Sequence, residues 1–427
     1  MRIPFSPPFI DEDVINEVVE CLKTGWITTG PKVKALEQEV CKLTGVEEAL
    51  CVNSWTSGAI LMLKWFGVGE GDEVIVPAYT YSATALAVLH CGATPVMVDI
   101  LDDLTIDYSQ IKEKINQHTK VIMPVDIAGW PCNYDEINAI VQSPEIMAQF
   151  ISKNKVQSNL GRILVIADVA HYIGAKFGGK ESGVLTDITI ISFHTVKNIT
   201  TGEGGVICLN LPDPFSNAKL YTYLRKMASN GQTKDAVIKS KAGNWRYDIT
   251  DLGFKMNLPD VCAAIGLAQI RKYTTHLLPT RKRIFDLYST EFSKYSWAQL
   301  PPQDTEKIQS SSHLFALRIK EISEKQRDEM IIEISKMGVS VNVHFIPMPM
   351  LTLFKNLGYQ MNEFPAAYDN YSREISLPIY PQLCKEQVDY VVQSVVKSYK
   401  KVVLKCLDFS ILFFPLQAYC YSVLSSY

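Results

Sequence analysis

Short apolar runs alternate with helical patterns along the first half of the chain. The runs are rich in Val and Ile without strict alternation, which is typical of strands buried on both faces of a parallel sheet. Helices are expected at 11–25, where the first turn is acidic, and at 81–92, which ends at a glycine. Strands are expected at residues 72–80, 93–99, 120–129, 161–170, 187–194 and 204–210. The pattern predicts an α/β fold with helices on both sides of a sheet.

From about residue 258 the pattern changes. Residues 258–295 form one long helical pattern, which we expect to bend near Pro279. Further elements are expected as a strand at 313–320, a helix at 324–338, a second strand at 339–345 and a helix at 386–402. This half therefore predicts a smaller α+β unit. We divide the chain into a large domain at 1–250, a small C-terminal domain at 251–402 and an apolar tail at 403–427.

Composition excludes several classes of function. The 42 basic and 45 acidic residues leave a net charge of −3, so no global field attracts nucleic acid or an anionic membrane. The ten cysteines form no CxxC pair and no Cys/His cluster, so no metal site is expected. The start of the chain lacks the features of a signal peptide, and a cytoplasmic protein is the expectation.

The end of the chain is strongly apolar at residues 409–424. This run is shorter than the roughly 20 residues that a membrane span needs, and Pro415 and Gln417 interrupt it. A tail docked on the protein or covered by a partner is favoured over an interfacial anchor. No membrane span is expected.

Two charged residues follow buried strands and suggest chemistry. Lys197 lies in the Gly/Thr-rich segment SFHTVKNITTGEGG (192–205), directly after a strand. Asp168 ends the strand ILVIAD, and the carboxyl ends of strands in such sheets border the ligand crevice. A lysine that forms a Schiff base and a carboxylate that keeps a pyridine nitrogen protonated are the pair that pyridoxal phosphate needs. Each residue alone has an ordinary alternative, a surface lysine and a helix N-cap.

Two further segments complete the pattern. In NSWTSGAILMLKWFG (53–67), Thr56 and Ser57 stand at a strand–helix junction, where amides and hydroxyls can cradle a phosphate. In PAYTYSATA (77–85), Tyr81 is the better placed of two tyrosines to stack on a cofactor ring. Capping and core packing are the alternatives. A phosphate cradle, an aromatic residue, a carboxylate and a lysine thus follow one another at successive strand ends.

At this point the chain resembles the fold-type-I pyridoxal-phosphate enzymes and, among them, the DegT/DnrJ/EryC1/StrS sugar aminotransferases. The matching motifs span roughly residues 1–400 and are GWITTGP (25–31), GDEVIVPAYTYSATA (71–85), DVAHYIGA (168–175), SFHTVKNITTGEGG (192–205) and GFKMNLPD (253–260). The resemblance implies a mainly parallel seven-stranded sheet between helices, with a smaller α+β domain after it. It also implies pyridoxal 5′-phosphate as cofactor.

The resemblance assigns roles residue by residue. Lys197 matches the Schiff-base lysine and proton shuttle, Asp168 the partner of the pyridine nitrogen, and His171 the residue near the ring oxygen. The remaining matches are phosphate ligands at Thr56, Ser57 and Ser192, the stacking aromatic at Tyr81, and Asn257, which would reach the phosphate of a neighbouring subunit. The implied unit is a homodimer with shared sites. The implied reaction moves an amino group, with glutamate as the expected donor, to a nucleotide-linked keto-sugar for deoxyamino-sugar or surface-polysaccharide synthesis.

Some positions depart from the family pattern. Trp55 replaces the usual glycine of the phosphate cradle, Asp126 stands where a histidine is frequent, and Pro349 replaces the second histidine of the segment that keeps His344. The last two lie where a sugar is expected, so the sugar's identity stays open. Two alternatives also remain open: a sugar dehydratase of the same fold, against which Lys197 argues because those enzymes are expected to have histidine there, and a catalytically silent regulatory relative.

Overall fold

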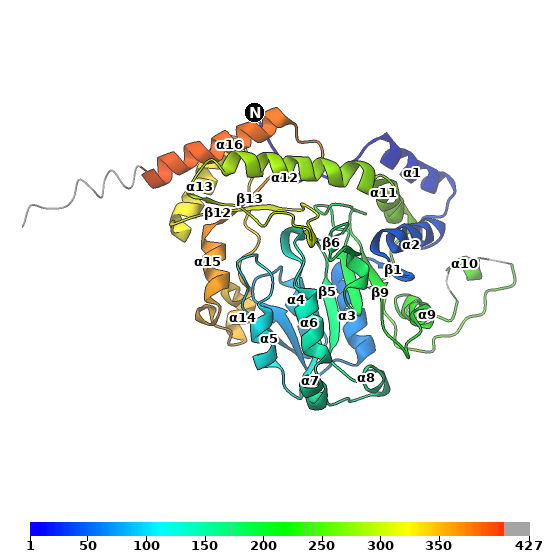
Figure 1. Ribbon diagram of the computed structural model, residues 1–427. Coiled ribbons are helices and arrows are strands. Elements are labelled where there is room, and N and C mark those ends of the chain that lie inside the picture. The colour runs from blue at the N-terminus through cyan, green and yellow to red at the C-terminus, as the bar shows by residue number, and fades with distance from the viewer. Residues whose placement is uncertain (172, 235, 241, 405–427) are drawn as a thin grey trace, which may run out of the picture.

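A seven-stranded sheet forms the centre of the protein (Figure 1). The structure is a computed structural model that describes residues 1–171, 173–234, 236–240 and 242–404. The strands run in the order β1-β9-β8-β5-β4-β2-β3, and β9 is antiparallel to both of its neighbours while the other pairs are parallel. Their bounds are β1 Glu48–Val52, β2 Glu73–Pro77, β3 Thr94–Val98, β4 Thr119–Ile122, β5 Leu164–Asp168, β8 Ile188–Ser192 and β9 Gly205–Leu209. The mainly parallel α/β fold is confirmed.

Helices cover both faces of this sheet because its strands are apolar on both faces. One face packs against α3 (Trp55–Phe66), α4 (Ala83–His90) and α9 (Asn217–Met227). The other face packs against α2 (Pro31–Thr44), α5 (Tyr108–Lys114), α6 (Tyr134–Gln142) and α11 (Asp260–Ile270). The amphipathic helix α1 (Glu12–Lys23) lies against α11, and the short helices α7 (Pro144–Gln149) and α8 (Lys155–Leu160) follow α6.

A smaller unit lies beyond one end of this sheet (Figure 1). Its antiparallel sheet consists of β10 (Ala298–Gln299), β12 (Phe315–Ile319) and β13 (Glu374–Leu377). Helices α12 (Leu278–Phe292), α13 (Glu324–Lys336) and α16 (Lys385–Tyr399) pack with it around a separate apolar core, which also takes in Ile3. The helices α14 (Thr352–Asn356) and α15 (Pro365–Arg373) connect this unit to the core of the large sheet. A small sheet of β6 (Lys176–Phe177), β7 (Lys180–Glu181) and β11 (Ile308–Gln309) lies apart from both.

Two predicted elements of the second half are wrong. Residues 339–345 form no strand and make only single bridges, between Val339 and Ile3 and between Asn342 and Ser376. The strand beside β12 is β13 instead, which leaves 342–345 free to border a pocket. The single helix expected at 258–295 is two helices separated by a π-helical turn at Tyr273–Leu277, and Pro279 lies in the first turn of α12, where proline is tolerated.

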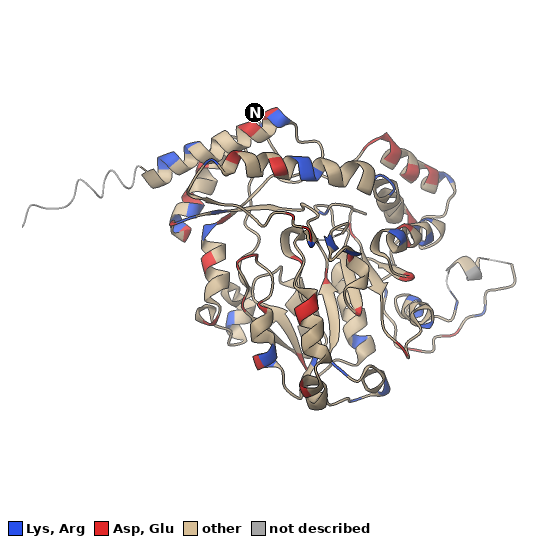
Figure 2. Cartoon of the chain, in the orientation of Figure 1, with Lys and Arg blue, Asp and Glu red and all other residues tan. Residues whose placement is uncertain are grey.

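Three further predictions concern the domain boundary, the apolar tail and the lack of a membrane span. The helix α11 packs with α1 and α2 rather than with the smaller sheet, and the division into domains at residue 250 stays a prediction. The predicted tail lies outside the described residues apart from Val403 and Leu404. Within the described part, no helix is long and apolar enough to cross a membrane. Basic and acidic residues are intermingled on the visible face, with acidic ones gathered on α1 (Figure 2).

Candidate active site

The register of two neighbouring strands brings Asp168 and Ser192 to the same face of the sheet. In β5, Leu164 and Ile166 point to the face covered by α3 and α4, and the alternation of side chains carries Asp168 to that face. Ser192 ends β8 in the same way, after Ile188 and Ile190. Because β5 and β8 are parallel neighbours, both polar side chains leave the sheet at its carboxyl edge, where ligands of such sheets bind.

Asp168 is a buried carboxylate in a polar setting. Thr84, in the first turn of α4, donates its hydroxyl to Oδ2 at 2.9 Å, and the Ala170 amide donates to Oδ1 at 3.1 Å. Burial raises the pKa of the Asp168 carboxyl to about 6, against the opposing effects of these two donors and of the Lys197 charge. No helix begins at Asp168, so the N-cap alternative does not apply.

Lys197 lies in a tightly held loop after β8. Its amide donates to the His194 carbonyl at 2.9 Å, and the next residue, Asn198, donates its side-chain amide to the Tyr273 hydroxyl at 3.1 Å and to the Ser311 carbonyl at 3.0 Å. Burial lowers the pKa of the Lys197 amine to about 8, although the Asp168 charge acts in the opposite direction. With such a pKa about a tenth of the lysine is uncharged at pH 7, far more than for an ordinary lysine, which suits a nucleophile.

The start of α3 forms the predicted cradle for a phosphate. Ser54 is the N-cap, and its hydroxyl accepts the Ser57 amide at 3.1 Å and donates to the Ser57 hydroxyl at 2.9 Å. The first amides of a helix have no partner inside it and point toward any bound anion. Trp55 is buried, and its indole Nε1 donates to the Ile190 carbonyl of β8 at 3.1 Å. The bond to Ile190 therefore holds the large side chain against the sheet.

Close backbone packing supports this cradle. A side chain at Gly205, the first residue of β9, would bring a Cβ within 2.7 Å of the Ser54 carbonyl carbon and the Trp55 nitrogen. Only glycine allows β9 to approach the start of α3 so closely. The missing Cβ thus fixes the helix terminus directly beside the sheet edge.

One cavity of about 560 Å³ joins these groups, a volume in the range of small-molecule sites. Six of the predicted residues line it: Thr56, Tyr81, Asp168, His171, Ser192 and Lys197. Ser57 and Asn257 do not line it, although Ser57 bonds to Ser54, which does. We call the part of the lining that comes from residues 54–204 the large-sheet wall. The part from residues 313, 314, 342–345 and 379 is the small-unit wall.

Tyr81 and Asn257 lie at the margins of this site. Tyr81 is 63% exposed, and its ring centroid is 5.9 Å from that of Phe345 in the small-unit wall. Its open ring face is available for stacking. Asn257 donates to the Thr29 hydroxyl at 2.6 Å, while its Oδ1 is buried without a partner.

Four histidines border the cavity, and hydrogen bonds define the protonation of two of them, His171 and His313. The Ala128 amide donates to Nδ1 of His171 at 3.2 Å, so the proton of this neutral ring is on Nε2. Burial and the Lys197 charge hold the pKa of His171 well below its usual value. His313 stacks on His171 with ring centroids 4.3 Å apart, and its Nδ1 lies 2.8 Å from Oδ1 of Asn198. Since that oxygen can only accept, Nδ1 of His313 carries the proton.

Sequence reasoning missed the small-unit wall apart from His344. His313 and Phe345 come from segments whose apolar patterns predicted strands, and nothing in those patterns singles them out. Ser54 was also missed, although an N-cap serine before an apolar helix is a recognisable signal. Of the departures from the family pattern, Asp126 and Pro349 do not border the cavity. Asp126 is buried and accepts hydrogen bonds from the Cys132 amide and the Tyr134 hydroxyl.

Comparison with known proteins identifies the family. The model of the DegT/DnrJ/EryC1/StrS aminotransferase family matches residues 8–396. The spore coat polysaccharide biosynthesis protein SpsC of Bacillus subtilis is 33% identical over 92% of this chain and 96% of its own. An uncharacterized protein of Methanocaldococcus jannaschii, MJ1066, is 35% identical over 93% and 98%.

Solved structures agree with this family. Spr1654 of Streptococcus pneumoniae, assigned as a sugar aminotransferase, is 41% identical in its PMP form with a TM-score of 0.90, covering 94% of this chain and all of that one. It has also been solved in a PLP form. PseC of Helicobacter pylori, an aminotransferase involved in the biosynthesis of pseudoaminic acid, is 25% identical with a TM-score of 0.80 over 94% and 100%. The chain therefore belongs to the DegT/DnrJ/EryC1/StrS aminotransferase family and is an aminotransferase, an enzyme whose cofactor is pyridoxal 5′-phosphate.

Proposed function

We propose that this enzyme transfers an amino group from glutamate to a keto group on a nucleotide-linked sugar, in the synthesis of a deoxyamino-sugar for a surface polysaccharide. The observation that carries the proposal is that Lys197 and Asp168 line one cavity, at the edge where β5 and β8 end. The polysaccharide and sugar functions of SpsC, Spr1654 and PseC support the substrate class.

The residues around the cavity fit pyridoxal phosphate. The start of α3, with Thr56 and Ser57, and the hydroxyl of Ser192 would hold the phosphate. Asp168 would bind the ring nitrogen, and the protonated Nε2 of His171 would donate to the ring oxygen. When bound, the cofactor supplies an electron sink that stabilises negative charge on the reacting carbon.

Asp168 and Lys197 would divide the chemistry. Asp168 accepts from Thr84 and Ala170, which favours its ionised form, and an ionised Asp168 would keep the ring nitrogen protonated. Lys197 would attach the cofactor until the amine of the substrate takes its place, and the freed amine would then accept a proton at Nζ and return it to a neighbouring carbon. The bonds of Asn198 hold this loop so that Nζ stays in the cavity.

We also propose a homodimer with shared sites, in which Asn257 reaches the phosphate bound by the partner. The described residues of the segment 230–255 extend away from the body beside α9 (Figure 1). They carry the exposed apolar side chains Trp245, Tyr247, Ile249 and Leu252, the last of which is 93% exposed. Such a surface is typical of a subunit interface.

The proposal is tested by a panel of keto-sugar nucleotides with glutamate as donor. One member of the panel should yield an amino-sugar nucleotide and an equal amount of 2-oxoglutarate. Transfer to free keto acids alone, with no keto-sugar nucleotide accepted, would contradict the sugar substrate. The same panel separates the dehydratase alternative, since loss of a hydroxyl without amine transfer would identify it.

A further inference from the structure

The smaller unit contains a buried hydrogen-bonded chain that ends at the cavity. The Glu374 carboxyl, at the start of β13, is fully buried. Its Oε1 accepts the Ser376 hydroxyl at 2.5 Å, and the Ser376 oxygen lies 2.9 Å from Nδ1 of His344. Its Oε2 accepts the backbone amide of His344 at 3.0 Å. His344 borders the cavity together with Lys197.

We propose that Glu374 and Ser376 are positioning residues, which hold His344 as a hydrogen-bond acceptor for a hydroxyl group of the acceptor sugar. The inference rests on the proposed function and deepens it. The contact is a hydrogen bond from a sugar hydroxyl to His344, and Glu374 and Ser376 fix the orientation of that histidine.

The charge on Glu374 follows from its surroundings. Arg318 is its direct neighbour across the β12–β13 pair, and Arg327 donates to the Glu374 carbonyl at 3.2 Å. Both guanidinium groups are buried; Arg327 forms ion pairs with Glu324 and Asp328, and Arg318 forms none within the described part of the chain. Burial raises the pKa of Glu374 to about 8, while the two arginines favour its ionised form. At pH 9 the carboxyl is therefore ionised in most molecules, and the arrangement described below is that of the alkaline side of this pKa.

Ionised Glu374 fixes the tautomer of His344. A carboxylate can only accept, so Ser376 gives it the single proton of the hydroxyl. The Ser376 oxygen can then only accept from His344, and Nδ1 must carry the imidazole proton. Burial and the Lys197 charge lower the pKa of His344 to about 3, so the ring holds one proton. Its Nε2 consequently presents a lone pair.

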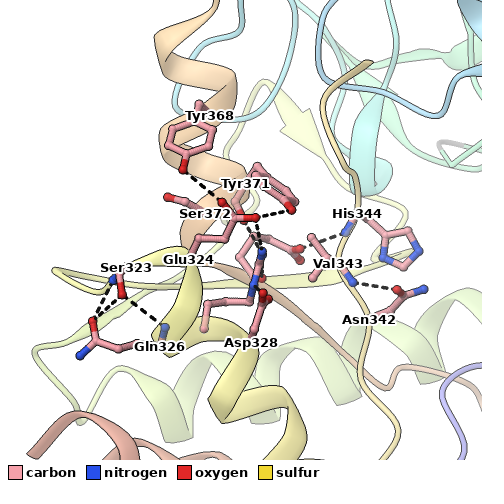
Figure 3. A network of polar contacts seen from close by, with 12 residues as sticks. Ser323, Glu324, Gln326, Asp328, Asn342, Val343, His344, Tyr368, Tyr371 and Ser372 are labelled. Carbon is pink, nitrogen blue, oxygen red and sulfur yellow. Dashed lines mark hydrogen bonds and ion pairs between the residues drawn. The ribbon is translucent and has the colours of Figure 1, made fainter. Parts of the chain in front are cut away.

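The ring is held firmly in this orientation. Tyr79 donates its hydroxyl to the His344 carbonyl at 2.6 Å, and Phe5 stacks on the imidazole with centroids 5.4 Å apart. Figure 3 shows the backbone of His344 bonded into the network, while its imidazole points away from Tyr371 and Asp328. Hydrogen bonds fix the backbone of His344, and stacking on Phe5 fixes its ring. The Nε2 edge of the ring is therefore the part left for a ligand.

A neutral His344 interacts differently with the two substrates, the keto-sugar and glutamate. An uncharged imidazole with a lone pair on Nε2 repels the carboxylates of an amino-acid donor and attracts a hydroxyl. The contact therefore favours the hydroxyls of the sugar over the carboxylates of glutamate. Loss of one neutral hydrogen bond, about 0.5–1.5 kcal/mol, corresponds to a roughly 2- to 12-fold weaker interaction.

The tautomer is measured directly by ¹⁵N NMR of the holoenzyme with labelled histidine at pH 9. Comparison with His344→Gln identifies the signal of His344 among the seven histidines. We expect protonation at Nδ1 in the wild type. A wild-type ring protonated at Nε2 would overturn the inference. This readout does not depend on turnover, so it stays valid if no keto-sugar is accepted and the proposed function itself fails.

A pair of serine variants gives the kinetic test. At pH 9, where Glu374 is ionised, Ser376→Ala should raise the KM for the keto-sugar nucleotide roughly 2- to 12-fold and leave the KM for glutamate unchanged. Ser372→Ala is the matched control, because Ser372 lies in the same network but bonds only to the Asp369 carbonyl. It should change neither KM. Equal changes for sugar and glutamate in Ser376→Ala, or the same change in Ser372→Ala, would contradict the proposal.

Discussion

The two walls of the cavity are built in different ways. In the large-sheet wall, Asp168 and Ser192 end adjacent parallel strands, and Lys197 follows one of them by a few residues. In the small-unit wall, His313 and His344 come from separate segments that only tertiary packing brings together. The first wall holds the groups that fit a cofactor, and the second presents acceptors that fit a sugar. The groups that fit the cofactor are thus encoded locally, while the proposed substrate contacts depend on how a second unit packs.

The largest expected effect lies in the large-sheet wall. Lys197→Ala removes both the attachment point and the proton carrier, so kcat should fall by at least about 10⁴-fold. Transamination and cofactor absorbance are the measurements. Lys180→Ala, at an exposed lysine of β7, is the control and should keep full activity. A Lys197→Ala enzyme that works at the wild-type rate would refute the assignment.

Asp168→Asn should have the next largest effect. The variant keeps the shape of the side chain but cannot hold a proton on the ring nitrogen, so kcat should fall roughly 10²- to 10³-fold. Thr84→Val removes only one donor to Asp168 and should cost about tenfold or less. Steady-state rates with saturating substrates check both. A larger loss in Thr84→Val than in Asp168→Asn would contradict the proposed roles.

Asn198 connects the two walls and sharpens the comparison. Its amide bonds the loop of Lys197 to Ser311 and His313. Asn198→Ala leaves these buried groups without partners, so the free energy of unfolding should fall by about 1–3 kcal/mol. Urea denaturation measures the loss. Asn116→Ala, at an exposed asparagine, should lose less than about 0.5 kcal/mol. Equal losses of unfolding free energy in the two variants would show that the bonds of Asn198 between the walls do not stabilise the fold.

The smallest expected effect is a change in how far the stability of the fold decreases at acid pH. The pKa of His344 is about 3 in the folded protein, below its usual value near 6.5. Between these values the unfolded chain binds more protons, so stability rises with pH across this window and falls on acidification. His344→Gln should flatten the fall by about 1 kcal/mol between pH 6.5 and 5.5. His118→Gln, at an exposed histidine, should not. Unfolding curves of the wild type and both variants at a series of pH values measure this difference.

The residues of the large-sheet wall could be predicted from the sequence because local patterns reveal the strands that they follow. Buried strands read as Val/Ile runs, and a charged residue at the end of such a run lies at the ligand edge, as Asp168 does. The strand expected at 339–345 was wrong because Val339, Val341 and Val343 alternate as in a strand, yet β13 occupies the place beside β12. Which of two apolar segments pairs with β12 depends on tertiary packing. The roles of His313 and Glu374 depend on the same packing and leave no local signal.

The central claim is that Lys197 carries the cofactor. Its most direct test is borohydride reduction of the holoenzyme, followed by proteolysis and mass spectrometry of the labelled peptide. We expect one pyridoxyl group per chain, attached at Lys197 in the segment between Ser192 and Gly205. A protein that binds the cofactor but carries the label on another lysine, or on none, would contradict it.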